Sequence, residues 1–293
     1  MHNKLNDRIA IAVFTLPAVV LFTTVVVYPV LKTVYTSLLD WDGLSQPSFM
    51  MFGNYMRLFG DPDFHLAVKN GLIFAAVLVI YQIGLGSVFA LILSNRRIAG
   101  KRFFRTAYFV PVVLSITVVC QLWLSIFNAD RGLLNNLFHA LGLTYRQSWL
   151  SSGKTAIVSV AFVNAWQYLG IHFSLIYAAI KSIPDHYYEA ALIDGASSFT
   201  AHCKITIPLL AETYRFCLII AITGGLKAFE NMYIMTGGGP GNLTYTLTYL
   251  IYKAAFRMNQ YGYACASASV LLLQCLVFTV LINRLIAHER VTY

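Results

Sequence analysis

The sequence predicts an all-α fold, a polytopic bundle of membrane-spanning helices, and three observations lead to that prediction. Of the 293 residues, 58% are hydrophobic and only 11% are charged, which is less than half of the ~25% charged residues usual in soluble domains. Runs of about 20 apolar residues recur, the length that crosses a bilayer as a helix. The strands of a membrane β-barrel would instead alternate in polarity over about ten residues.

Six spans are expected in one transmembrane domain comprising residues 1–293. Their approximate bounds are 10–31, 72–94, 105–127, 156–180, 208–232 and 264–286. The first apolar run is too long for a signal peptide and no small-residue cleavage site follows it, so we interpret it as a span. Its Pro17 and Pro29 are tolerable because neighbouring groups can satisfy the freed backbone atoms of a membrane helix.

Basic residues between the spans set the expected orientation, because such residues collect on the cytoplasmic side. The segment SNRRIAGKRFFR between the second and third spans contains five basic residues and no acid: Arg96, Arg97, Lys101, Arg102 and Arg105. With an even number of spans, both termini are then cytoplasmic. Basic residues near the two ends agree with this: Lys4, Arg8, Arg284 and Arg290. The net charge of +9 is therefore attributed to membrane topology, and no nucleic-acid partner is expected.

The same orientation places residues 39–70 outside and the polar segment of about 184–204 in the cytoplasm. The outer loop is acidic, because four aspartates outnumber Arg57 and Lys69: Asp40, Asp42, Asp61 and Asp63. The inner segment reads EAALIDGASSFTAHCKITIPLL from Glu189 to Leu210. These two loops are therefore expected on opposite faces of the membrane.

The inner segment predicts a short helix, a turn and a second helix. Pro184 and Asp185 suit the start of a helix, and Ala190 and Ala191 are strong helix formers of little bulk. Gly195 can end that helix by adopting a left-handed conformation. The small residues would allow another surface to approach closely. A plain solvated connector between the fourth and fifth spans is the alternative.

The spacing within this segment resembles a family signature. Glu189-Ala190-Ala191 is followed after three residues by Gly195, and after nine more by Ile205-Thr206-Ile207-Pro208. This is similar to the E-A-A, G, I-x-L-P signature of the inner-membrane permease subunits of binding-protein-dependent ABC importers, with isoleucine at 207 where leucine is usual. The resemblance implies a coupling helix that docks in a groove of a separate ATPase subunit. Its implied docking residues are Glu189, Ala190, Ala191 and Gly195.

Two further stretches resemble the carbohydrate-importing branch, and most closely the maltose-type first permease subunit. They are MFGNYMRLFGDPDFHLAVKN and AFENMYIMTGGGPGNLTYTLTYLIYKAAFRMNQYGYACASA. The resemblance spans nearly the whole chain and implies the type I permease fold of ABC importers in the bacterial inner membrane. It also implies four kinds of partner: a second homologous permease subunit, two ATPase subunits, an extracytoplasmic solute-binding protein and the lipid bilayer.

No nucleotide, metal or catalytic site is expected in this chain. The run TGGGPG at 236–241 lacks the G-K-[ST] ending of a P-loop, and SGKT at 152–155 has Ser148 where a P-loop has glycine. The five cysteines show no metal-ligand spacing. ATP and Mg are therefore expected on the partner subunits, and the chain itself is not expected to be an enzyme.

Polar residues inside the fourth and fifth spans are candidates for a substrate site, because polar groups in spans usually face a cavity or a partner helix. The two sets share helix faces by spacing: Asn164, Gln167 and Tyr168 in one span, and Lys227, Glu230 and Asn231 in the other. Amide and hydroxyl groups could bind sugar hydroxyls. The alternative is that Asn164 and Gln167 bond a neighbouring helix, and that Lys227 pairs with Glu230.

The resemblance bears on three of these positions and adds Tyr108. It implies that Asn164 lines a sugar pathway, that Gln167 and Tyr168 occupy neighbouring lining positions with side chains that depart from the maltose-type pattern, and that Tyr108 matches a lining tyrosine. At three more lining positions small residues replace polar ones, which argues against maltose itself: Ala221, Gly225 and Ala228.

The function expected from the sequence is a permease subunit of an ATP-driven importer of a sugar or oligosaccharide. Lys227 leaves glycerol phosphate or an anionic sugar as an alternative, which the neighbouring Glu230 weakens. An ion-coupled secondary transporter would need buried acids near the midplane, and only Glu230 qualifies loosely. A membrane scaffold without transport is the remaining class.

Overall fold

The computed structural model describes residues 4–94, 98–153 and 155–286, with side chains described from residue 10 onward, and these residues are mostly helical. Several residues used above lie outside this part: Arg96, Arg97, Lys154 and Arg290, together with the side chains of Lys4 and Arg8. The chain divides into two compact units, Met1–Asp61 with Ile251–Val270, and Pro62–Leu250 with Leu271–Tyr293.

The first unit contains the N-terminal helix and a small structured loop. Its helical elements are α1 (Lys4–Phe22), η1 (Thr23–Val27), α2 (Tyr28–Thr36), α3 (Gly53–Phe59) and η4 (Lys253–Arg257). Strand β1 (Leu39–Asp40) pairs antiparallel with β2 (Ser48–Phe49), so that Leu39 faces Phe49 across the ladder. Helix α16 (Tyr261–Leu285) begins in this unit, and α15 (Leu247–Tyr252) ends in it.

Wide π-helical turns precede two of the prolines. The turns η1 and η3 (His202–Thr206) contain Val25 and Lys204, the residues four positions before Pro29 and Pro208. A proline ring clashes with the carbonyl of residue i−4 and leaves it without its donor, and a widened turn relieves that clash. Both prolines therefore stay within helical chain, as expected for Pro29.

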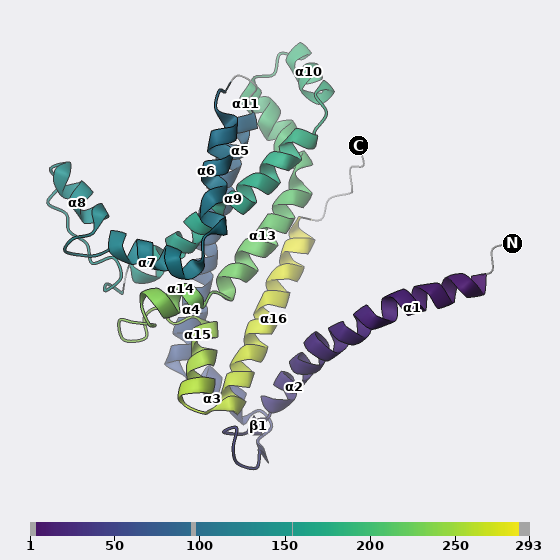
Figure 1. Ribbon diagram of the computed structural model, residues 1–293, viewed down its shortest axis with the longest axis vertical. Helices are drawn as coiled ribbons and strands as arrows, with labels where there is room; N and C mark the ends of the chain where they lie inside the picture. The colour runs from purple at the N-terminus through teal and green to yellow at the C-terminus, as the bar shows by residue number, and fades with distance from the viewer. Residues whose placement is uncertain (1–3, 95–97, 154, 287–293) are drawn as a thin grey trace. The chain divides into compact units, whose positions relative to one another are not determined.

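The second unit contains most of the bundle (Figure 1). In chain order, its first helices are α4 (Pro62–Leu78), η2 (Val79–Leu85), α5 (Gly86–Ser94), α6 (Lys101–Val113), α7 (Ile116–Ile126), α8 (Leu133–Ala140) and α9 (Ala156–Ser182). They are followed by α10 (His186–Ile193), α11 (Ser198–Ala201), η3, α12 (Ile207–Leu209), α13 (Ala211–Leu226) and α14 (Glu230–Met235).

Helix α9 is the centre of this unit and contacts α4, α5, α6, α7, α13 and α14. Small residues allow these contacts, as is usual between membrane helices. A Cβ atom at Gly170 of α9 would lie 2.2 Å from the backbone oxygen of Tyr108, and one at Gly225 of α13 would lie 2.6 Å from the Cα of Ala75. The backbones of α6 and α9, and of α4 and α13, therefore meet directly.

Four helices of the described chain are long and apolar enough to cross a membrane: Ala10–Thr36, Pro62–Ser94, Ala156–Ser182 and Tyr261–Leu285. Two bent pairs raise the number to six if each pair is one span: Lys101–Val113 with Ile116–Ile126, bent by 102°, and Ser198–Leu209 with Ala211–Leu226, bent by 68°. The helix expected from residue 72 begins earlier, at Pro62, because the amphipathic residues before the apolar run continue the same helix.

The helices expected over 105–127 and 208–232 are not continuous. Leu114 and Ser115 are extended, with ψ of 143° and 137°, a few residues after Pro111, and they separate α6 from α7. Helix α13 ends at Leu226, directly after the flexible pair Gly224 and Gly225, and α14 begins only at Glu230. Lys227 and Glu230 therefore do not share one helix, and the expectation that their spacing places them on one helix face is wrong.

Candidate functional site

The segment after α9 has the predicted helix–turn–helix form, with α10 followed by α11. Gly195 ends α10 with φ of +73°, so the left-handed conformation expected of it is confirmed. The backbone N–H of Gly195 donates to Leu192 (3.0 Å) and that of Ala196 donates to Ala191 (2.9 Å). These two bonds satisfy carbonyls at the end of the helix and define a Schellman motif.

No residue of α10 is fully buried, although Tyr187 and Tyr188 pack partly against the core. Glu189 and Ala190 are exposed, Ala191 is half-buried and Gly195 is exposed. Leu192 and Ile193 are 74% and 86% exposed. The sequence reasoning named the small residues and missed these two large apolar ones, although their position directly after the E-A-A triplet was a usable signal.

Phe199 of α11 adds to this apolar surface, being 78% exposed. A Cβ atom at Gly195 would meet no other atom within 4 Å. We call Glu189, Leu192, Ile193, Gly195 and Phe199 together the α10 surface. It combines one carboxylate, three large apolar side chains and an open glycine, which suits a surface that another protein covers.

One side of α10 is tied back to the bundle. The hydroxyl groups of Tyr188 and Thr206 lie 2.9 Å apart, and Nδ1 of His202 lies 3.0 Å from the same Thr206 oxygen. Thr206 is fully buried and stands just before α12 and α13. A buried hydroxyl therefore connects α10 to the segment that leads into α13.

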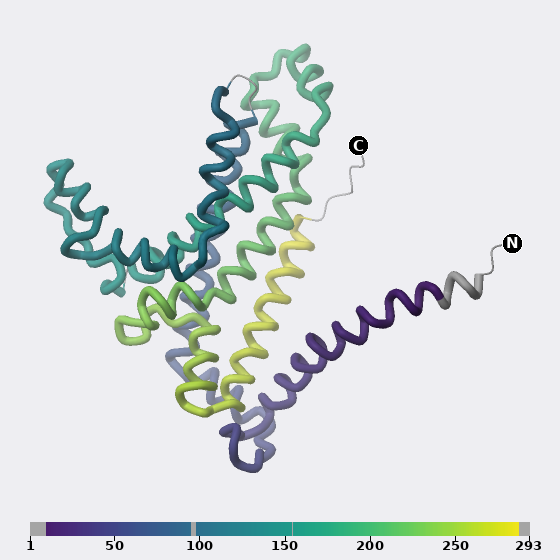
Figure 2. Tube along the Cα trace, in the orientation of Figure 1, coloured from purple at the N-terminus to yellow at the C-terminus, as the bar shows by residue number. Residues whose placement is uncertain are grey.

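A cavity of about 710 Å³ lies between the end of α9 and the start of α10. It is lined by Ser94, Ile180, Lys181, Ser182, Ile183, Pro184, Asp185, Tyr188, Ser198 and His202. Side chains do not fill this volume, so the attachment of α10 depends on specific contacts such as that between Tyr188 and Thr206. Figure 2 shows α10 and α11 at the end of α9 opposite to α7 and α14.

Polar residues of the fourth and fifth expected spans meet at the end of α9 that lies near α7 and α14. Asn164 of α9 donates to Oδ1 of Asn231 in α14 (2.9 Å), and Asn231 donates in turn to Sγ of Cys120 in α7 (3.7 Å). Asn231 and Cys120 are fully buried, whereas Asn164 is half-buried. This chain of bonds joins three helices, two of which belong to interrupted segments.

Gln167 has a structural partner. Its Nε2 donates to the backbone oxygen of Leu114 (3.0 Å), the carbonyl that the break between α6 and α7 leaves without a helical donor. In a membrane such a carbonyl needs a partner. Gln167 Oε1 is buried and has no hydrogen bond within the described residues. Tyr168, one residue later, is half-buried.

Tyr108 lies in an aromatic cluster between α5, α6 and α9. Its ring stacks on Phe89, with centroids 4.7 Å apart and planes 4° apart, and meets the edge of Phe173 at 5.4 Å. Lys227 and Glu230 are exposed, and no ion pair joins them in the described part of the chain. Of the candidates Lys227, Glu230 and Asn231, it is Asn231 that forms a hydrogen bond with Asn164 in the described residues.

His172 is a further polar residue in α9 that the sequence reasoning did not select. It is buried, its Nδ1 lies 3.4 Å from the oxygen of Tyr168, and its Nε2 has no partner among the described residues. Its place one turn after Tyr168 on a span already rich in polar groups was the signal that could have identified it.

Comparison with known proteins gives consistent matches. Residues 82–290 match the family model described as "Binding-protein-dependent transport system inner membrane component". A probable ABC transporter permease protein of Bacillus subtilis, YurN, is 36% identical over 94% of this chain and 95% of its own. The permease protein MsmF of the multiple sugar-binding transport system of Streptococcus mutans is 35% identical over 83% of each chain.

A solved structure shares the fold. It belongs to a bacterial alginate ABC transporter crystallised with an alginate pentasaccharide-bound periplasmic protein, and it matches with a TM-score of 0.83 and 21% identity over 96% of this chain and 95% of that one. At that identity the likeness concerns the fold alone. The fold described above is therefore one that a chain of that transporter also adopts.

Proposed function

The chain belongs to the family of inner-membrane components of binding-protein-dependent transport systems, and from this premise we propose that it is a permease subunit of an ATP-driven bacterial importer of a sugar or oligosaccharide. A solute-binding protein delivers the substrate from outside. ATP and Mg bind to two separate ATPase subunits, so this chain contributes the pathway and no catalysis.

The α10 surface is the observation that carries this proposal. A soluble loop connecting two spans has no need of exposed leucine, isoleucine and phenylalanine side chains, and such patches mark contacts with partners. Leu192, Ile193 and Phe199 offer this patch beside the carboxylate of Glu189. An ATPase subunit that covers the patch would move α10, and the Tyr188–Thr206 contact would pass the movement to α13.

Basic residues support the cytoplasmic position of this surface. Lys101, Arg102 and Arg105 begin α6, and the guanidinium of Arg105 lies 5.0 Å from the ring centre of Tyr177 near the end of α9. Lys181 Nζ donates to the backbone oxygen of Ser94 (2.9 Å) at the same end. By the positive-inside rule this end faces the cytoplasm, and an even number of spans then places both termini there.

A second, homologous permease subunit completes the proposed assembly. The apolar stretch Ala10–Thr36 is long enough to span the membrane, and no residue in its most apolar 18 residues is buried within this chain. Its side chains are therefore available to lipid and to a partner helix. The proposed complex contains two permeases, two ATPase subunits and one docked binding protein.

A carbohydrate substrate is supported by the relative MsmF, which is named for a multiple sugar-binding transport system. Asn164, Gln167 and Tyr168 are then pathway candidates on α9, with Tyr108, Lys227, Glu230 and Asn231 around them. The bond to Asn231 uses one N–H of the half-buried Asn164 side chain, which leaves the second N–H and the Oδ1 atom to engage a sugar hydroxyl. Asn164→Ala is accordingly expected to lower uptake while basal ATPase activity stays near normal, and uptake kinetics equal to those of the unchanged protein would remove Asn164 from the pathway.

A pair of matched glycine variants tests the proposal. Gly195 and Gly142 both have positive φ (+73° and +76°), and a Cβ atom at either would meet nothing within 4 Å. Leucine at either position therefore costs the same backbone strain, about 1–2 kcal/mol. Only at Gly195 would the added side chain collide with a docked ATPase subunit.

The expected result is a difference between the two variants in the reconstituted complex. Gly195→Leu should abolish substrate-stimulated ATPase activity and uptake or prevent assembly, and Gly142→Leu should retain both. Equal uptake by the two variants at equal expression would contradict docking at α10. A panel of neutral and anionic sugars and glycerol phosphate, offered to the binding protein, then decides the substrate class.

A further inference from the structure

The short helix α3, in the first unit, shows an outward apolar face that the transport role does not use. Phe52, Met56 and Phe59 follow one another by four and three residues and so share one side of the helix. They are 62%, 72% and 56% exposed. The opposite side carries Asn54 and Leu58, which are buried. The helix is thus amphipathic with its inner side already packed.

The inner side of α3 fixes it to the end of the first span. Asn54 Nδ2 donates to the backbone oxygens of Ser37 (2.9 Å) and Leu39 (2.8 Å), which directly follow Thr36, the last residue of that helix. The hydroxyl groups of Ser37 and Tyr55 lie 2.7 Å apart. The outward face of α3 is therefore held within a few residues of the point where the first span leaves the membrane.

The start of the last span is tied to the same helix. Arg57 donates to Oε1 of Gln260 (3.0 Å), and its guanidinium lies 5.2 Å from the ring centre of Tyr263 in the first turn of α16. Tyr263 in turn donates to a carboxylate oxygen of Asp61. Two membrane helices thus end at the level of α3, which cannot move away from the membrane surface without breaking these bonds.

We propose that Phe52, Met56 and Phe59 insert into the outer leaflet of the bilayer at the boundary between headgroups and acyl chains, so that α3 is an interfacial anchor joining the ends of the first and last spans. Amphipathic helices with bulky apolar residues bury that side at this boundary. The outward face carries no carboxylate, and Phe49, Met50 and Met51 extend the same apolar character before it. This proposal does not depend on the substrate or on the ATPase contact.

Spin-label accessibility in the complete complex, reconstituted in liposomes, tests the proposal. Met56→Cys is labelled in a Cys203→Ser background, because Cys203 is the exposed one of the five cysteines. Collision rates of the label are measured with oxygen, which concentrates in lipid, and with a water-soluble nickel chelate. Phe52→Cys provides a second site on the same face.

Gln46→Cys is the matched control in the same unit. Gln46 is exposed in the loop between β1 and β2, near Asp42, whose carboxylate accepts bonds from the backbone N–H groups of Leu44 and Ser45 and from the Ser45 hydroxyl. Those bonds lower the pKa of Asp42 to about 2, so the charged loop is expected to stay in water. Its label should collide freely with nickel.

The proposal expects labels at 56 and 52 to collide readily with oxygen and several-fold less with nickel than the label at 46. Nickel collisions equal to those at 46 would overturn it by placing the face in water. Low collision rates with both reagents at 56 and 52 would overturn it equally, because a protein surface such as the second permease would then cover α3.

Discussion

Helices α8 and α10 invite comparison because their backbones are built alike. Each has eight residues and each is followed by a glycine in the left-handed region, Gly142 and Gly195. The same pair of bonds closes both: Gly142 and Leu143 donate to His139 and Phe138 (3.0 and 2.9 Å), as Gly195 and Ala196 do to Leu192 and Ala191. Local geometry alone does not tell them apart.

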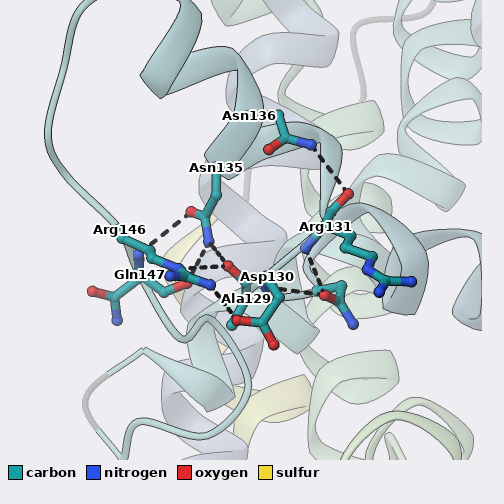
Figure 3. A network of polar contacts seen from close by, with 8 residues as sticks. Ala129, Asp130, Arg131, Asn135, Asn136, Arg146 and Gln147 are labelled. Carbon is teal, nitrogen blue, oxygen red and sulfur yellow. Dashed lines mark hydrogen bonds and ion pairs between the residues drawn. The ribbon is translucent and has the colours of Figure 1, made fainter.

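The two helices differ in what their side chains contact. Asn135 of α8 is buried and donates to the oxygens of Ala129 and Gln147 (3.0 Å each), and it accepts from Nε1 of Trp149 (3.1 Å). Figure 3 shows the bonds from Asn135 to Ala129 and Gln147, together with Arg146, which also reaches Ala129 and Asp130. No residue of helix α10 is fully buried, and although Tyr187 and Tyr188 pack partly against the core, Leu192 and Ile193 are 74% and 86% exposed. The difference between the two helices is therefore that α8 buries a polar anchor and α10 leaves large apolar side chains exposed.

The largest effect on folding is expected in the network of α8. Asn135→Ala leaves the Trp149 N–H and the Gln147 backbone oxygen without the partner that Asn135 provides, and it removes one of the two donors to the Ala129 oxygen, which costs about 1–3 kcal/mol. Asn136→Ala, one residue later, removes only an exposed bond to Arg131 and should stay within about 0.5 kcal/mol. Thermal unfolding of the two purified variants measures the difference, and equal midpoints would refute the structural role of Asn135.

An intermediate effect is expected where α10 is attached. Tyr188→Phe removes the bond to Thr206 and should lower stability by about 0.5–1.5 kcal/mol, while uptake per ATP hydrolysed falls because movement is no longer passed to α13. Tyr145→Phe is the control, since it removes an exposed bond to Gln147 beside α8. If both variants keep the unchanged ratio of uptake to hydrolysis, Tyr188 is not part of the transmission path.

The smallest effect on folding is expected on the α10 surface itself. Ile193→Ser should change the free energy of unfolding by no more than about 0.5 kcal/mol, because the side chain is almost entirely exposed, yet it should weaken binding of the ATPase subunit. Leu137→Ser, on the exposed side of α8, is the control and should leave ATPase binding intact. Co-purification of the ATPase subunit measures both, and equal recovery would argue against an apolar contact at 193.

The sequence predicts best what depends on local chemistry. The end of α10 at Gly195 follows from the need for positive φ, and the long apolar runs around α9 and α16 follow from the thickness of the bilayer. The motif spacing likewise identified the surface residues Glu189 and Ala190 without any knowledge of their neighbours. Each of these features is decided within a few consecutive residues.

Features decided between distant segments were not predictable. The break at Leu114 and Ser115 carries no proline or glycine of its own, and it is stabilised by Gln167, more than 50 residues later. The bond from Asn164 to Asn231 requires that α14 turn away from α13, which the expected continuous span excluded. Leu192 and Ile193 follow the E-A-A triplet directly, but their exposure becomes evident only when the rest of the chain is seen not to cover them.

Photo-crosslinking from position 193 tests most directly whether α10 contacts an ATPase subunit. A benzoylphenylalanine placed there, in the complete complex in membranes, should crosslink to an ATPase subunit, and the yield should change when ATP is added. The same probe at Leu137 of α8 should give no such product. A probe at 193 that crosslinks to no ATPase subunit, or a cysteine there that an impermeant reagent labels from the cell exterior, would contradict the assignment of α10 as the coupling surface.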